Sequence, residues 1–171
     1  TYIGDVNNNG WITGTARYAA LPGVEWRGFV RKDGVWTDVG DFGGSRTDAR
    51  AVNNLGVAVG NSRNTQNNNV AFKWDPDTES LTQLLPSFDL CRSIAYDIND
   101  AGIVVGFGSC SSTSRALYWL PGDSRGRKLN DLLPPDSGWS NLTYAQAVDN
   151  CGVVIGQGIR QDRPGYFSAF M

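Results

Sequence analysis

The feature that most constrains this chain is a short stretch used four times, in which polar turn residues ending in glycine precede alternating apolar residues and a second glycine. The first glycines of the four copies are Gly10, Gly56, Gly102 and Gly152, so the copies recur at steps of 46, 46 and 50 residues. A fixed step of this size indicates repeated supersecondary units, each packed on its neighbours. The chain is therefore expected to form a single repeat domain over residues 1–171.

Each copy fits a tight hairpin turn. Asn or Asp stands at the first turn position, two permissive residues follow, and the fourth position is glycine. This order predicts a type I turn whose glycine adopts the left-handed region, a common hairpin with a glycine bulge. Alternating apolar residues on both sides of the turn predict the two paired strands.

A third and a fourth strand are expected after each hairpin. The third strand follows a polar loop of variable length and places a small residue before a large apolar one, as in Ala71-Phe72 and Ala116-Leu117. Each unit is therefore predicted to be a meander of up to four antiparallel strands, and the last unit lacks its outer strand. The units span approximately residues 1–40, 41–85, 86–133 and 134–171.

The repeat also predicts how the units assemble. A lone four-stranded sheet cannot cover its own apolar faces, so the units must stack. Radial stacking predicts an all-β fold, a small β-propeller of about four repeat units. A β-solenoid or a sandwich is the alternative, and no helix is expected.

Composition restricts the partners and cofactors. The 15 basic and 17 acidic residues are scattered and give a net charge of -2, so neither nucleic acid nor an anionic membrane is an expected partner. The longest apolar runs are strand-sized, which argues against a membrane span. The chain has no histidine, which excludes a histidine triad or zinc site from this chain alone. Residues 5–10 match the first half of a calcium loop, but the other copies replace its oxygen donors, so no metal or other cofactor is expected.

Two of the three cysteines carry information about location. Cys91 and Cys110 flank the third hairpin at equal distances from its centre, near Asp100-Ala101. Equidistant residues face each other across an antiparallel ladder, which predicts a disulfide, with two buried free thiols as the alternative. A bulge at the turn would shift this register by one residue. A disulfide favours an extracytoplasmic location. The third cysteine, Cys151, lies inside the fourth turn and is expected to be unpaired.

The recurring pattern also resembles a known family. An alanine precedes a Val/Ile-Asn/Asp-x-x-Gly-x-Val-x-Gly hairpin and Ala-Phe-x-Trp follows it, which resembles the HAF-type extracellular repeat family. Residues 36–44, Trp-Thr-Asp-Val-Gly-Asp-Phe-Gly-Gly, are similar to that family's Leu-Gly-x-Leu-Gly-Gly connector. The histidine of the family's His-Ala-Phe triplet is replaced here by Val70, Arg115 or Ser168. The resemblance implies a secreted or cell-surface bacterial β protein of propeller type and supplies no catalytic residue.

Candidate binding residues lie near the variable segments. Variation among the copies is concentrated after the second strand, in residues 15–27, 61–69, 107–114 and 157–165, which predicts variable loops on one face. Guanidinium groups there suit carboxylates or acidic sugars, and exposed indoles offer stacking platforms for sugar rings. The candidate ligand-binding residues are Arg17, Arg63, Arg160, Trp26, Trp36 and Trp139. Isolated surface arginines, and tryptophans packed between units, are the alternative interpretation.

Together these features predict a secreted or cell-surface binding or assembly module, located outside the cell, at its surface or in the periplasm. The expected partner is another extracytoplasmic protein or a glycan. One alternative is an accessory subunit of a larger extracytoplasmic complex or fibre, whose incomplete last unit receives a strand from another chain. The other is a polysaccharide-acting hydrolase with carboxylate catalysis by Asp5 and Asp97, which occupy equivalent positions in two units.

Overall fold

The structure is a computed structural model that describes residues 1–17, 26–87 and 90–171. Regular structure in these residues is all-β apart from one 3-10 turn, in agreement with the predicted class. In chain order the elements are β1 (Tyr2–Val6), β2 (Ile12–Arg17), β3 (Trp26–Lys32), β4 (Val35–Asp38), β5 (Gly43–Val52), β6 (Ala58–Asn64), β7 (Asn69–Asp75), β8 (Ser80–Leu84), β9 (Arg92–Ile98), β10 (Val104–Cys110), β11 (Thr113–Trp119), β12 (Arg127–Lys128), η1 (Leu129–Leu132), β13 (Trp139–Val148), β14 (Val154–Arg160) and β15 (Phe167–Phe170). Within the described ranges no helix has the length and apolarity needed to cross a membrane.

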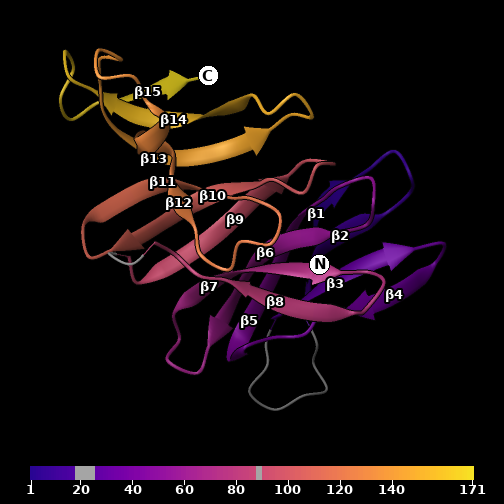
Figure 1. The fold of residues 1–171 in the computed structure, drawn as a ribbon. Coiled ribbons are helices and arrows are strands. Elements are labelled where there is room, and N and C mark those ends of the chain that lie inside the picture. Colours follow the sequence, from indigo (N-terminus) through magenta and orange to yellow (C-terminus); the bar gives the residue numbers. More distant parts are fainter. Residues whose placement is uncertain (18–25, 88–89) are drawn as a thin grey trace.

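The strands form four successive antiparallel meanders, which we call units 1 to 4. Unit 1 contains β1–β4, unit 2 β5–β8, unit 3 β9–β12 and unit 4 β13–β15. Inside a unit each strand pairs with its neighbour in sequence, and one parallel pairing, of Trp26 with Arg46, joins the sheets of units 1 and 2 at a corner. Figure 1 shows the units following one another from indigo to yellow, with unit 4 at one edge of the fold.

Apolar side chains between successive units hold the stack together. One cluster lies between units 1 and 2 and includes Val30, Val39, Val52 and Phe72. A second lies between units 2 and 3, and a third between units 3 and 4. Each inner unit therefore buries one sheet face against the unit before it and the other against the unit after it. The first strands of neighbouring units, β1, β5, β9 and β13, also contact one another along one edge of the stack.

The stack is open. None of the sheets closes on itself, and no core cluster of the described residues joins unit 4 to unit 1. The all-β class is as predicted. A closed propeller ring is not shown, and these sheets are also compatible with the sandwich alternative. Among the described residues no further unit covers the outer faces of units 1 and 4.

The variable loops are shorter than predicted because the strands extend into them. Paired residues reach Arg63 and Asn69 in unit 2 and Cys110 and Thr113 in unit 3. Polar residues are accommodated in these ladders because antiparallel sheets can leave side chains facing water. Three tryptophans expected in or near loops are accordingly in strands: Trp26 begins β3, Trp36 lies in β4 and Trp139 begins β13. Part of the expected loop 15–27, residues 18–25, lies outside the described residues.

Each hairpin turn is built by its first residue. The turn glycines Gly10, Gly56, Gly102 and Gly152 have φ of 79°, 85°, 80° and 85°, in the left-handed region that glycine adopts without steric cost. In unit 2 the amide of Gly56 donates to the carbonyl of Asn53 at 3.0 Å. The Asn53 side-chain oxygen accepts the amides of Leu55 at 3.1 Å and Val57 at 3.0 Å. The side chain thus stabilises its own turn, as Asn does in Asx turns.

The same asparagines link each turn to the next unit. The side-chain NH2 of Asn7 donates to the carbonyl of Asn53, that of Asn53 to the carbonyl of Asn99 at 3.1 Å, and that of Asn99 to the carbonyl of Asp149 at 2.9 Å. Only Asn supplies both the acceptor for its own turn and the donor for the next one. Unit 4 has Asp149 at this position, which keeps the acceptor, bonded to the amides of Cys151 and Val153, and has no donor when ionised. We call this series the asparagine ladder.

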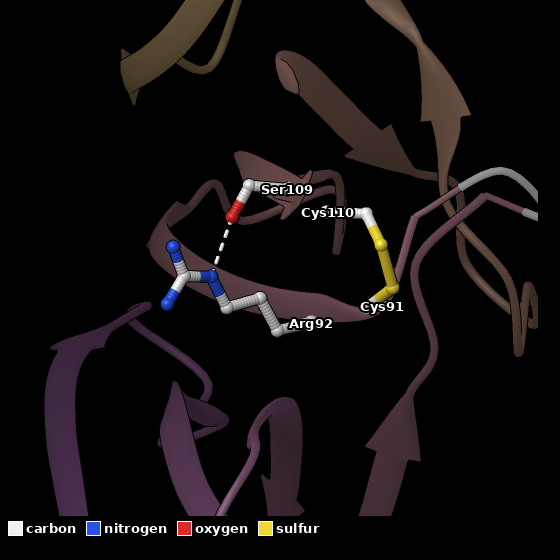
Figure 2. Close-up of a disulfide and its surroundings, with 4 residues drawn as sticks. All are labelled: Cys91, Arg92, Ser109 and Cys110. Carbon is white, nitrogen blue, oxygen red and sulfur yellow. Dashed lines mark hydrogen bonds between the residues drawn. A yellow bond between two sulfur atoms is a disulfide. The ribbon is translucent and has the colours of Figure 1, made fainter. Parts of the chain in front are cut away.

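The predicted disulfide is confirmed. Cys91 and Cys110 are bonded, with Cα atoms 4.9 Å apart, next to the Arg92 Nε to Ser109 Oγ hydrogen bond of 2.6 Å (Figure 2). The turn pairs Val104 with Ile98, a register in which the two cysteines would be offset by one residue. A bulge near Tyr96 then shifts the register so that Ser109 pairs with Arg92 and the cysteines lie opposite each other. Cys151 is free and exposed, as expected.

Candidate ligand-binding site

A cleft of about 300 Å³ opens beside the first strands of units 1 and 2. This volume is at the lower end of the range for ligand pockets, roughly 300–1,000 Å³. Three strands, β1, β2 and β5, supply its walls. The lining residues are Tyr2, Ile3, Gly4, Thr15, Arg46, Asp48, Ala49 and Arg50.

The charged residues of the cleft come from one strand. Arg46, Asp48 and Arg50 are alternate residues of β5, and alternate side chains of a strand lie on the same face. Arg46 Nε donates to both Asp48 oxygens at 2.9 and 3.0 Å, and Arg50 Nε donates to Asn61 Oδ1 at 2.9 Å. Asp48 is buried and also accepts the Thr15 hydroxyl at 3.2 Å. A buried carboxylate therefore fixes the positions of the surrounding donors.

The two guanidinium groups keep donors available for a ligand. Their bonds to Asp48 and Asn61 use Nε, and no described residue accepts from the terminal nitrogens of Arg46 or Arg50. The hydrogen bond that Arg46 donates to Asp48, stronger than the opposing effect of burial, raises the pKa of Arg46, so this guanidinium stays charged. Two cations and one anion leave the charged groups of the cleft with a net positive charge.

Aromatic rings border the cleft. The Trp26 ring lies 5.5 Å from the Tyr2 ring, and the Arg46 guanidinium lies 5.5 Å from the Trp26 ring centre. On the other side the Arg50 guanidinium lies 5.4 Å from the centre of the Tyr96 ring, which belongs to unit 3. Cation–π contacts of this kind hold a guanidinium over a ring while its edges remain free to donate.

The aromatic surface continues from the cleft toward unit 4. Tyr96 stacks on Phe107 with ring centroids 5.6 Å apart, Phe107 contacts Tyr144 at 4.7 Å, and Tyr144 contacts Phe167 at 6.3 Å. Phe167 is 60% exposed, and the other three rings are partly exposed. Tyr96 and Tyr144 belong to the first strands β9 and β13, whereas Phe107 and Phe167 come from β10 and β15. We call the cleft and this aromatic row together the first-strand surface.

This arrangement suits binding more than acid–base chemistry. The single carboxylate in the cleft, Asp48, is occupied by Arg46, Thr15 and, at 3.4 Å, the Asn61 amide. No group of three metal-ligating side chains occurs in the described part of the chain. The free guanidinium edges can pair with a carboxylate through two parallel hydrogen bonds, and the rings can stack on sugar faces.

The predicted binding residues are distributed over four places. Arg17 and Trp26 are register partners in β2 and β3, and Trp26 borders the cleft. Trp139 and Arg160 are register partners in unit 4, with the guanidinium 5.5 Å from the ring centre and Nε bonded to Asp162 at 2.9 Å. They are remote in sequence from the residues that line the cleft.

The remaining two candidates lie elsewhere. Arg63 donates to Asn67 at 3.1 Å at the tip of β6. Trp36, 57% exposed, lines a separate cleft of about 330 Å³ on unit 1, where Phe29 packs against it at 4.5 Å and Arg31 lies 5.4 Å from its ring. The structure therefore does not gather the six predicted residues into one site.

Sequence reasoning missed the β5 residues of the cleft. Arg46, Asp48 and Arg50 directly follow residues 36–44, the stretch that resembles a connector between repeats and that drew attention to its glycines. The available signal was the period of two in Arg-x-Asp-x-Arg, because it places three charges on one face of a strand. The partners Tyr2 and Thr15 come from the preceding unit, so no local pattern could have identified them.

The two acids considered for catalysis have structural partners. Asp5 accepts the amides of Val6 at 2.8 Å and Val52 at 3.1 Å. Asp97 accepts those of Ile98 and Val148, both at 2.8 Å. Each carboxylate thus binds one amide of its own unit and one of the next. Burial raises the pKa of Asp97, the two amide bonds oppose this, and the charge of Asp5 raises it further.

Comparisons of the chain with protein-family models, with curated proteins and with solved structures find no match. The function is therefore argued from the geometry of the site.

Proposed function

We propose that the protein is an extracytoplasmic binding module that recognises a carboxylated polysaccharide along its first-strand surface. The observation that carries this proposal is the pair of guanidinium groups, Arg46 and Arg50, held on either side of Asp48 and flanked by aromatic rings. Among the described residues nothing accepts from their terminal nitrogens. A carboxylate binds the guanidinium edges bidentately, and sugar rings stack on Tyr2 and Trp26.

The length of the surface favours a polymer over a single sugar. Beyond Arg50 the rings of Tyr96, Phe107, Tyr144 and Phe167 follow one another across units 3 and 4. Successive rings along one edge provide repeated stacking positions for successive sugars. The cleft would hold the charged sugar of the polymer, and the aromatic row would hold the sugars that follow it.

The disulfide supports the location. Bonded cysteines persist in oxidising compartments, so Cys91–Cys110 fits a protein that is secreted, attached to the cell surface or periplasmic. On this proposal the units are blades of an open propeller-type stack and the chain is a member of the HAF-type extracellular repeat family. The hydrolase alternative is less favoured, because Asp5 and Asp97 are occupied by backbone amides of two units.

Calorimetric titration with an oligogalacturonate, and with its methyl ester as the uncharged control, tests the proposal. Charge-assisted hydrogen bonds contribute about 1.5–3 kcal/mol, so Arg50→Gln or Arg46→Gln is expected to weaken binding roughly tenfold to a hundredfold. Arg63→Gln is the matched control, since it removes the same charge at the tip of β6. Equal binding of the ester, or a larger effect of Arg63→Gln than of Arg50→Gln, would exclude the cleft.

A further inference from the structure

The two outer faces of the stack are equivalent to faces that are buried elsewhere in the same chain. Each inner unit has an N-side face, packed on the preceding unit, and a C-side face, packed on the following unit. Among the described residues, none of the four units packs on the N-side face of unit 1 or on the C-side face of unit 4. Aligning the repeats on their turn glycines shows which residues these two faces present.

The C-side face of unit 4 repeats that of unit 2. Val57 and Val59 of unit 2 pack into the cluster shared with unit 3, where Val59 and Ala71 are fully buried. The equivalent residues of unit 4 are Val153, Ile155 and Ala169. Val153 is 44% exposed and Ile155 is 46% exposed. Met171, directly after β15, is 91% exposed.

The N-side face of unit 1 repeats that of units 2 and 3 in the same way. Ala49, Val52, Phe72 and Leu81 of unit 2 pack against unit 1. Their equivalents in unit 1 are, in the same order, Ile3, Val6, Phe29 and Trp36. Ile3, Val6 and Trp36 are 61%, 62% and 57% exposed.

The backbone polar groups at the two faces also match the junction between units 2 and 3. There Ala51 stands where units 1 and 3 have a carboxylate, and the amide of Ile98 bonds to its own Asp97. Unit 4 has Ala147 at this position, and the amide of Val6 in unit 1 bonds to its own Asp5 at 2.8 Å. A contact between unit 4 and unit 1 therefore leaves no additional amide unpaired at this point.

We propose that these two faces bind each other between molecules, so that a second copy of this chain stacks head to tail, its unit 1 on unit 4 of the first. The contact is heterologous, because the surfaces of the two partners differ, and such contacts build either rings or open chains. Its template is the buried junction of units 2 and 3, with Val153, Ile155 and Ala169 against Ile3, Val6 and Trp36; Phe29 is only 5% exposed and lies beneath Trp36.

One residue opposes the contact. In the asparagine ladder, Asn53 donates to the carbonyl of Asn99 across the template junction. Unit 4 has Asp149 at the equivalent position, which places an anion against the carbonyl of Asn7 in the second copy. Asp149→Asn restores the donor, and a hydrogen bond of about 0.5–1.5 kcal/mol is expected to tighten self-association roughly twofold to tenfold.

Sedimentation velocity over a range of protein concentrations tests the proposal, with Ile155→Lys blocking the C-side face and Val6→Lys blocking the N-side face. Ile3 of the N-side face also lines the cleft, but Val6 and Ile155 do not, so glycan binding by these two lysine variants reports separately on the proposed function. Both side chains are about half exposed or more, so lysine is expected to leave the fold intact, which circular dichroism checks.

The expected result is concentration-dependent association of the wild type, tighter for Asp149→Asn, and monomers for each lysine variant alone. Mixing the two lysine variants is then expected to give a one-to-one dimer, because each supplies the face that the other lacks. Met171→Lys serves as a second block of the C-side face if Ile155→Lys does not fold. The proposal is overturned if wild type and Asp149→Asn both remain monomeric, or if Ile155→Lys abolishes a dimer that Val6→Lys leaves intact and mixing does not restore.

Discussion

Asn53→Asp tests whether the asparagine ladder stabilises the contact between units 2 and 3. Asn53 is 4% exposed, its oxygen accepts the amides of Leu55 and Val57, and its NH2 donates to the carbonyl of Asn99 at 3.1 Å. Aspartate keeps the acceptor and the size of the side chain. The substitution replaces the NH2 group of Asn53, which donates to the carbonyl of Asn99, by a carboxylate oxygen that faces this carbonyl.

The expected cost follows from two contributions. Loss of the inter-unit hydrogen bond removes about 0.5–1.5 kcal/mol, and leaving a buried group without a partner costs about 1–3 kcal/mol, more when it is charged. We therefore expect the free energy of unfolding to fall by about 2–4 kcal/mol at neutral pH. For a domain stabilised by about 5–15 kcal/mol this is a large fraction of the total.

The loss is expected to depend on pH with a definite sign. Burial beside a carbonyl disfavours the charged form, so the pKa of the introduced carboxyl in the folded state lies above its unfolded value of about 3.9. A protonated carboxyl can donate to Asn99, so the variant approaches wild-type stability below that pH and loses stability as the pH rises through the raised pKa.

Urea unfolding followed by circular dichroism at several pH values measures both effects. Asn68→Asp is the matched control, because it makes the same charge change at an exposed position. A variant within about 0.5 kcal/mol of the wild type at neutral pH, the range of ordinary surface substitutions, would refute the stabilising role of the ladder.

Two further predictions concern the disulfide and the buried carboxylate. Replacing Cys91 and Cys110 by alanine removes a link between residues that are 19 apart in the sequence, and this is expected to lower the free energy of unfolding by about 3 kcal/mol. Added reductant should destabilise the wild type and leave the double variant unchanged. Because burial raises the pKa of Asp97 from 3.8, its ionised form is disfavoured in the folded state, so the wild type is expected to lose stability relative to Asp97→Asn as the pH rises through that raised pKa. Denaturation across this pH range, with the exposed Asp136→Asn as control, checks the second prediction, and parallel profiles for wild type and Asp97→Asn would contradict it.

The local structure was accessible from the sequence because it is encoded locally. The Asn/Asp-x-x-Gly pattern specifies the turn and the flanking alternation specifies the strands, so the meanders follow from each copy alone. The cysteine pair was also predictable, although the reason is less simple than symmetry about the turn. The bulge near Tyr96 is what brings Cys91 and Cys110 into register.

The relations between units were less accessible. Asn7, Asn53 and Asn99 were interpreted as turn formers, which accounts for their oxygens and leaves their NH2 groups without a role. That role requires the next turn to lie within hydrogen-bond distance, a fact of stacking that a single copy does not contain. For the same reason Asp5 and Asp97 could be considered as a catalytic pair, although each binds amides of two units.

The position of the cleft follows from how a stacked repeat can vary. The clusters between units contain mainly small or apolar side chains, whereas first-strand residues at the cleft meet the neighbouring units through polar or aromatic groups: Asp48 accepts from Thr15 of unit 1, and Arg50 lies over Tyr96 of unit 3. At the positions of Arg46, Asp48 and Arg50, unit 3 has Arg92, Ile94 and Tyr96, so the first arginine recurs and the other two residues differ. This variation lies inside the matched stretch of the repeat, so a search for function confined to the irregular loops passes over it. Arg50 of the cleft and Tyr96, the first ring of the aromatic row, are consequently two uses of the same structural position.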